Sequence, residues 1–131
     1  MRACSLLLLA LSACVSTPAN LRAGDQWVAT DVNGFPVGAS NAPTLRLEDG
    51  NRMSGSAGCN RVSATYRHGS RDAISFGPLA VTKMACEPAV MEQERRYLAI
   101  LSQVQGYSLY GDGGISLVAA DGSAIRYRRD R

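Results

Sequence analysis

The stretch MSGSAGCNR, residues 53–61, decides the fold of this 131-residue chain. Its two glycines, Gly55 and Gly58, lie three positions apart, and the residues that follow alternate between apolar and polar as far as Tyr66. Glycine loops that hold phosphates open directly into a helix, whereas this one leads into a predicted β-strand. We therefore interpret Gly55 and Gly58 as positions of tight backbone packing in a bulged strand, with phosphate binding as the disfavoured alternative.

Similar alternating segments lie on both sides of this stretch. They begin near Gln26 and recur along the chain, and most are followed by turns rich in Gly, Asp, Asn or Ser. They cover residues 44–48, 52–55, 62–66, 74–76, 107–109, 115–117 and 125–127. A period of two is typical of half-buried antiparallel strands, so the sequence predicts a β-rich domain.

One segment follows a helical period instead. Between Pro88 and Gln105 there is no Gly and no further Pro, and one face of the predicted helix carries Val90, Met91, Tyr97, Leu98, Leu101 and Val104. Pro88 suits the first helical turn, and Gly106 is placed to end the helix. The predicted order is therefore about five strands, one helix and three strands.

Glu94 falls on the buried face of this predicted helix. A buried carboxylate must be paired or hydrogen-bonded, because an isolated buried charge is costly. Lys83, Arg61 and the Asn60 amide are candidate partners. We expect a strut between the helix and the loops that carry the motifs, and the alternative is an acid in a pocket.

The N-terminal residues indicate export. Residues 11–14, Leu-Ser-Ala-Cys, follow an apolar run behind Arg2 and resemble a bacterial lipobox. The resemblance implies cleavage before Cys14 and its lipidation, and Val15, rather than Asp, points to the outer membrane. The expected organisation is a signal peptide at 1–13, the lipidated Cys14 and a tether at 14–24, and one domain at 25–131.

The cysteines and charges follow from this organisation. Cys4 would leave with the signal and Cys14 would carry lipid, so Cys59 and Cys86 remain and predict one disulfide in an oxidising compartment. The alternative, a nucleophilic cysteine, needs a nearby base, and the only histidine, His68, lies in an expected exposed turn. Cleavage would leave 13 basic and 11 acidic side chains, which argues against nucleic-acid binding.

Four segments together resemble one family. Residues 53–61 with Tyr66 are similar to the GxxGCN…Tyr motif of the META/HslJ-like domain. Residues 79–86, LAVTKMAC, resemble its second motif, a Thr shortly before Met-x-Cys. Residues 94–101 resemble its helix and residues 117–122 its last hairpin, so the resemblance covers roughly residues 25–128. The motif residues singled out as structural are Gly55, Gly58, Asn60, Tyr66, Thr82 and Glu94.

The resemblance implies a mainly β fold, a small antiparallel β-barrel of about eight strands with one α-helix between strands 5 and 6. The family includes heat-shock-associated proteins and envelope lipoproteins, some linked to antibiotic tolerance, and it implies no defined biochemical activity.

We therefore expect a non-enzymatic, monomeric lipoprotein of the outer membrane that faces the periplasm and serves stress tolerance through binding or scaffolding. The alternative is a module that captures a small ligand or inhibits an enzyme through loops at the barrel end. Neither hypothesis requires a metal or a cofactor. The C-terminal arginines are expected to be solvated, with contact to anionic lipid headgroups as the alternative.

Overall fold

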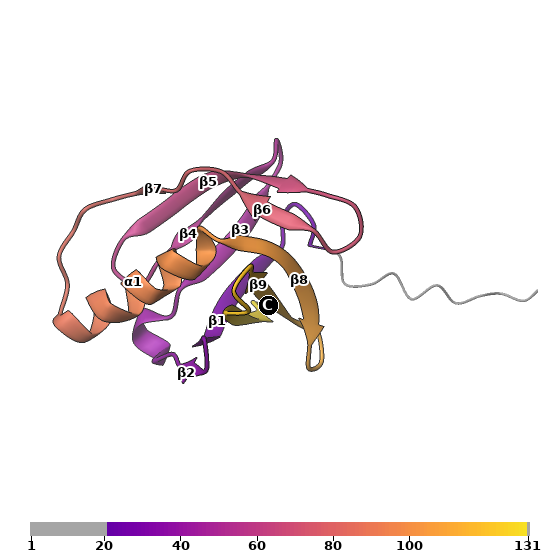
Figure 1. Ribbon diagram of the computed structural model, residues 1–131. Coiled ribbons are helices and arrows are strands. Elements are labelled where there is room, and N and C mark those ends of the chain that lie inside the picture. Colours follow the sequence, from indigo (N-terminus) through magenta and orange to yellow (C-terminus); the bar gives the residue numbers. More distant parts are fainter. Residues whose placement is uncertain (1–20, 131) are drawn as a thin grey trace, which may run out of the picture.

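The computed structural model describes residues 21–130 and shows a mainly β fold with one helix (Figure 1). The first strands are β1 (Gln26–Val32), β2 (Phe35–Pro36), β3 (Thr44–Glu48), β4 (Arg52–Ser56), β5 (Arg61–His68), β6 (Ile74–Phe76) and β7 (Ala80–Val81). The helix α1 (Pro88–Leu101) follows, and then β8 (Val104–Tyr110), β9 (Gly114–Ala119) and β10 (Ala124–Arg129). A short 3₁₀ turn, η1 (Ala39–Asn41), precedes β3.

The strands form an antiparallel barrel that is nearly closed. Eight of them lie in the order β6-β5-β4-β3-β1-β10-β9-β8, and the two-residue strands β2 and β7 pair with β1 and β5. The ends of this path meet at a bridge between Ala73 and Gly106, where the Tyr107 amide donates to the Asp72 carbonyl at 3.0 Å. The predicted β-barrel of about eight strands is confirmed.

The apolar residues of the alternating segments form the core. Trp27, Leu45, Leu47 and Met53 all point inward and are buried. From the other side of the barrel the core receives Ile115, Leu117, Ile125 and Tyr127. Large side chains therefore occupy the barrel interior, and the polar residues between them face outward.

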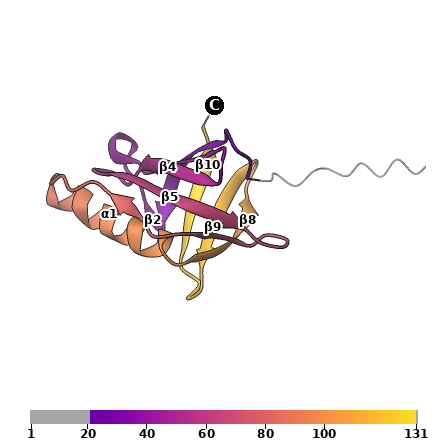
Figure 2. The same cartoon turned by 90° about the horizontal axis from the view of Figure 1, so that it is seen from above.

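The helix lies to one side of the strands in both views and contacts β1, β9 and β10 (Figures 1 and 2). Its residue Tyr97 reaches the core, where its hydroxyl accepts a 2.9 Å hydrogen bond from the hydroxyl of Tyr127. Burial raises the pKa of both tyrosines above the ordinary value, so this contact joins two neutral phenols.

The helix is shorter than the sequence predicts. It ends at Leu101 rather than Gln105, and Gly106 lies in β8 instead of ending the helix. Val104 misled the prediction because it sits three residues after Leu101, on the helical face, yet it also faces the core from β8. The sequence placed the helix between strands 5 and 6, whereas it lies between β7 and β8. The difference arises because β2 and β7 have two residues each, too few to show a period.

The described chain packs against the barrel before β1 begins. Leu21 is buried in the core, and the Gly24 amide donates to the Leu47 carbonyl at 2.7 Å. The polar sequence around Leu21 gave no sign of this contact. Residues 1–20, including Cys4 and Cys14, lie outside the described residues, as does Arg131.

Gly55 is required where β4 approaches the start of β3. A Cβ built on Gly55 would overlap the carbonyl oxygen of Thr44, which is backbone and cannot rotate away. Its φ is not in the left-handed region, so the constraint is space rather than backbone conformation.

We expect Gly55→Ala to lower the free energy of unfolding by about 1–3 kcal/mol, because the added methyl group forces β4 and β3 apart. Gly38→Ala is the matched control, since a Cβ at Gly38 meets nothing within 4 Å and its φ is −68°. Thermal and urea unfolding measure both. Equal stability of the two variants would show that β4 can shift without cost.

Candidate functional site

The Glu94 carboxylate joins the helix to the loop between β4 and β5. Glu94 is 4% exposed, and its Oε1 accepts hydrogen bonds from the amides of Cys59 at 3.1 Å and Asn60 at 2.6 Å. Its Oε2 accepts from Nδ2 of Asn60 at 2.7 Å. Three donors therefore compensate the burial of this carboxylate.

The Asn60 side chain uses its full hydrogen-bonding capacity. Besides Glu94, its Nδ2 donates to the Met84 carbonyl at 3.1 Å. Its Oδ1 accepts from the Met84 amide at 2.6 Å and from the Thr82 hydroxyl at 3.0 Å. An Asn side chain can donate two hydrogen bonds and accept two, so this buried amide has no unused donor or acceptor, that is, no free hydrogen-bonding valence.

Thr82 and a disulfide add two further contacts between the same segments. The Thr82 hydroxyl accepts from the Arg61 amide at 3.0 Å, next to Asn60 at the start of β5. A disulfide links Cys59 to Cys86, with their Cα atoms 6.0 Å apart. The β4–β5 loop, the segment before the helix and the helix itself are thus fixed to one another by polar and covalent contacts.

This joint, formed by Cys59, Asn60, Thr82, Cys86 and Glu94, matches the strut hypothesis. The proposed Asn60 amide is a partner of Glu94, whereas no contact of Glu94 with Lys83 or with the Arg61 side chain occurs in the part of the chain described here. Both thiols are oxidised in the disulfide, and His68 is exposed at the end of β5, against the edge of Tyr66. Among residues 21–130, no cluster of His, Cys, Asp and Glu could hold a metal ion.

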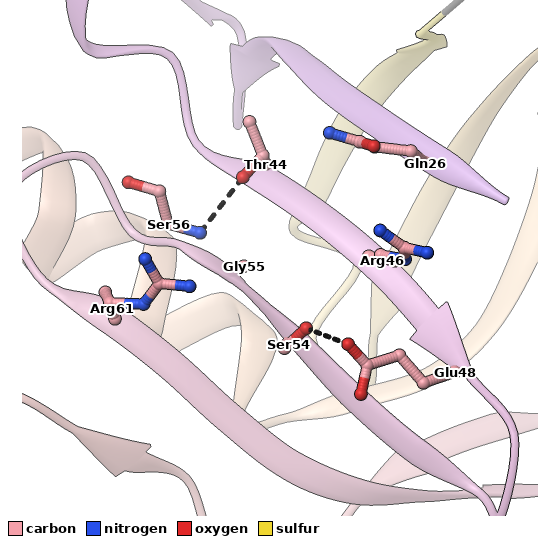
Figure 3. A pocket seen from close by; sticks show the side chains of 8 residues that line it. All are labelled: Gln26, Thr44, Arg46, Glu48, Ser54, Gly55, Ser56 and Arg61. Carbon is pink, nitrogen blue, oxygen red and sulfur yellow. Dashed lines mark hydrogen bonds between the residues drawn. The ribbon is translucent and has the colours of Figure 1, made fainter. Parts of the chain in front are cut away.

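A second polar site lies on the outer face of the barrel. A groove of about 290 Å³ runs across β1, β3, β4 and β5 (Figure 3). Its lining consists of Gln26, Thr44, Arg46, Glu48, Ser54, Gly55, Ser56 and Arg61. The strand register brings them together, since Gln26 pairs with Arg46, Arg46 with Ser54, and Ser56 with Arg61.

Two arginines flank this groove without a carboxylate partner. Arg46 and Arg61 lie on either side of the strand that carries Gly55 (Figure 3), and neither makes a salt bridge within residues 21–130. The nearest acid in the lining, Glu48, accepts a 2.7 Å hydrogen bond from the Ser54 hydroxyl. The groove therefore has an excess of positive charge, with one acid at its edge.

A protein-family model matches most of this sequence. The META domain model matches residues 19–131, nearly all of the sequence. The chain belongs to the META domain family. The matched range begins before the boundary at residue 25 that the sequence suggested, and it includes Leu21, which packs into the barrel of this META domain.

Solved structures share the fold of this META domain. A protein from Burkholderia xenovorans, solved by NMR, is 25% identical with a TM-score of 0.67, and the match covers 86% of each chain. A second NMR structure is also 25% identical, with a TM-score of 0.64, over 79% of this chain and 87% of the other. A DUF4847 family protein from Bacteroides vulgatus is 13% identical, with a TM-score of 0.60, over 84% of this chain and 94% of the other. No curated protein matches the sequence.

The structure brings some of the predicted site residues together and separates others. Gly58 lies beside the joint, with a φ of +121°, and a Cβ there would meet Gln93 and Val90 of the helix at 3.8 and 3.9 Å. Tyr66 instead packs into the core farther along β5, and Gly55 contributes backbone to the outer groove.

Sequence reasoning missed two kinds of residue. Met84 takes part in the joint through its backbone, which its side-chain type does not reveal. The groove residues of β3 were visible as the polar half of an alternating strand, but their proximity to Arg61 depends on the strand register.

We expect Glu94→Ala to destabilise the domain by about 3 kcal/mol or more, because two buried donors of Asn60 and the part-buried amide of Cys59 would lose their acceptor, at roughly 1–3 kcal/mol each. Glu94→Gln should cost less, since a carbonyl oxygen still accepts the two amides while its NH₂ group opposes that of Asn60. Urea unfolding measures both.

Glu92→Ala is the control for the Glu94 variants, because Glu92 pairs with Arg95 and Arg96 near the surface. Exposed pairs contribute about 0–1 kcal/mol, so this change should be small. Equal losses for Glu92→Ala and Glu94→Ala would contradict the strut.

The disulfide should act as a structural element. We expect Cys59→Ala and Cys86→Ala to destabilise alike, by about 3.5 kcal/mol for the loop entropy alone, and the double variant to be no worse. Their sequence separation of 27 sets this loop length. Unfolding curves of the three variants and of the reduced wild type measure the effect, and a loss confined to one cysteine would show a separate role for that thiol.

Proposed function

We propose that this META-domain chain is a non-enzymatic lipoprotein of the bacterial envelope that serves stress tolerance through binding or scaffolding. The observation that carries this proposal is how the motif residues are used. Asn60 has no free hydrogen-bonding valence, Glu94 accepts three hydrogen bonds, and both cysteines are in a disulfide. Groups held in this way stabilise a scaffold, and a general base or nucleophile needs a free valence.

The barrel interior is filled with side chains, which favours binding at the outer surface. It is filled by Trp27, Tyr97, Tyr127 and many aliphatic side chains. A filled interior leaves no room for a ligand inside the barrel, so a partner of this domain would meet its outer face or its ends. Phe35, Met84, Leu109 and Tyr110 are large apolar residues exposed there.

The place in the envelope rests on Cys14. In residues 21–130 no helix has the length and apolar character that crossing a bilayer demands. Lipid chains at Cys14 would supply stable attachment, because two or more acyl chains hold a protein on a membrane. Val15 after this cysteine supports the outer membrane, and a heat-shock relation to HslJ-like proteins is proposed on the motif resemblance.

Small-ligand binding is the second candidate function, and the outer groove favours it. In this candidate the ligand would lie on the strand face of β3 and β4, where the groove is, rather than on loops at the barrel end. It combines two arginines, an acid and several hydroxyl groups, which suits a polar ligand.

The anchor can be tested by Cys14→Ser. We expect the variant to leave the membrane fraction or to accumulate as uncleaved precursor, and to lose survival under envelope stress, because the protein no longer sits at its membrane. Cell fractionation, intact mass and survival of a complemented deletion strain measure these outcomes.

His68→Ala is the matched control for function. It should keep both membrane attachment and stress survival, since the side chain of this exposed histidine makes no hydrogen bond or salt bridge within residues 21–130 and packs against the Tyr66 ring. An unchanged mass and membrane fraction for Cys14→Ser would refute the lipid anchor. Lost survival with His68→Ala at full stability would argue for an enzymatic role.

A further inference from the structure

We infer that the outer groove of the barrel binds a ligand that carries a phosphate or carboxylate group next to a hydroxyl group, as in an acidic sugar. Arg46 and Arg61 would hold the acid group, and Glu48 would accept the neighbouring hydroxyl. This inference deepens the proposed binding role, because it names a ligand class for a domain whose motif residues serve stability.

In the described part of this domain four arginines pair with a carboxylate, and Arg46 and Arg61 are among the arginines that do not. Arg95 and Arg96 pair with Glu92, Arg126 pairs with Asp31, and Arg129 pairs with Asp25. Within residues 21–130, Arg46 and Arg61 have no carboxylate within 4.0 Å. Guanidinium groups match phosphate and carboxylate oxygens with two parallel hydrogen bonds, and such charge-assisted bonds are the strong ones.

Two hydroxyl groups lie level with Arg61 on the neighbouring strands and accept hydrogen bonds from the backbone (Figure 3). The Thr44 hydroxyl accepts the Ser56 amide at 3.0 Å, and the Ser56 hydroxyl accepts the Gly58 amide at 3.2 Å. Neither hydroxyl donates its own hydrogen to any acceptor in the described part of the chain. Each hydroxyl therefore keeps a hydrogen that an anion held by Arg61 could accept.

Glu48 makes the groove selective for more than charge. It lines the same groove, and its Oε1 is occupied by Ser54, which leaves Oε2 as a free acceptor. A bare anion gains nothing from this carboxylate and is repelled by it, whereas a hydroxyl next to the acid group can donate to it. An acidic sugar fits both halves of the groove.

The groove is held on rigid elements. Its residues come from paired strands, and Arg61 is the first residue of β5, directly after the buried Asn60. Gly55, where a side chain would collide with Thr44, adds only backbone to the lining. The backbone of the groove thus needs little ordering when a ligand binds, and the ordering cost falls on the exposed side chains of Arg46 and Arg61.

The test is an NMR titration of the full chain in non-ionic detergent with glucose 6-phosphate, glucuronate, glucose and inorganic phosphate. We expect the first two to shift the Ser56 amide and the arginine side-chain signals, and glucose to shift neither. Arg46→Gln and Arg61→Gln should each weaken binding at least tenfold. Glu48→Gln should reduce the preference for glucose 6-phosphate over inorganic phosphate.

Arg67→Gln is the charge-matched control. It removes the same charge from the same strand, but six residues from Arg61, roughly 20 Å along β5, and it should leave binding unchanged. The amide spectrum of each variant shows whether the barrel is intact. These measurements do not depend on Cys14, so failure of the anchor and failure of the groove are distinguishable.

Each outcome decides the inference. Binding of the sugar acids that depends on both arginines supports a soluble ligand, and the same shifts only after phosphatidylglycerol is added to the micelles support a headgroup as its source. Equal affinity for inorganic phosphate and glucose 6-phosphate would reduce the groove to an unspecific anion site and overturn the inference. No shift with any probe, or equal weakening by Arg67→Gln, would overturn it as well.

Discussion

The buried carboxylate of Glu94 joins the helix to the barrel of this domain. Glu94 comes from the helix, and its three donors come from the loop between β4 and β5. Removing a charge from water is costly, so the helix can dock in this position only when the loop presents those donors. The interaction therefore fixes the positions of both partners. The helix holds the β4–β5 loop in place, and the loop in turn fixes where β5 begins.

The consequences extend beyond the contact itself. Asn60 links Glu94 to Met84 and Thr82, and Thr82 in turn receives the amide of Arg61. The disulfide closes the same region covalently. Arg61 directly follows Asn60 of the joint, and its side chain lines the outer groove. A structural network between the helix and the barrel thus positions a charge on the outer face.

The sequence predicted the parts of this structure that follow a period. Alternating segments such as 44–48 and 115–117 became strands, and the helical face correctly placed Glu94 among buried residues. The prediction failed where one residue satisfies two periods, as Val104 does, and where strands such as β2 and β7 are too short to show one. Leu21 and the outer groove depend on contacts between distant segments, and those contacts are fixed by strand register, which a single sequence does not display.

The joint and the outer groove use largely different residues, so the groove can change without loosening the scaffold. The joint uses motif residues and the disulfide, and changing them would loosen the barrel. Gln26, Arg46 and Glu48 lie outside those motifs, on the outer face, where a substitution removes no core contact. A barrel of this shape can thus exchange its groove residues at little cost in stability, and the DUF4847 family protein shares the fold at 13% identity. Similarity of fold therefore carries the scaffold from one relative to another, while the ligand must be argued from the groove residues of each chain.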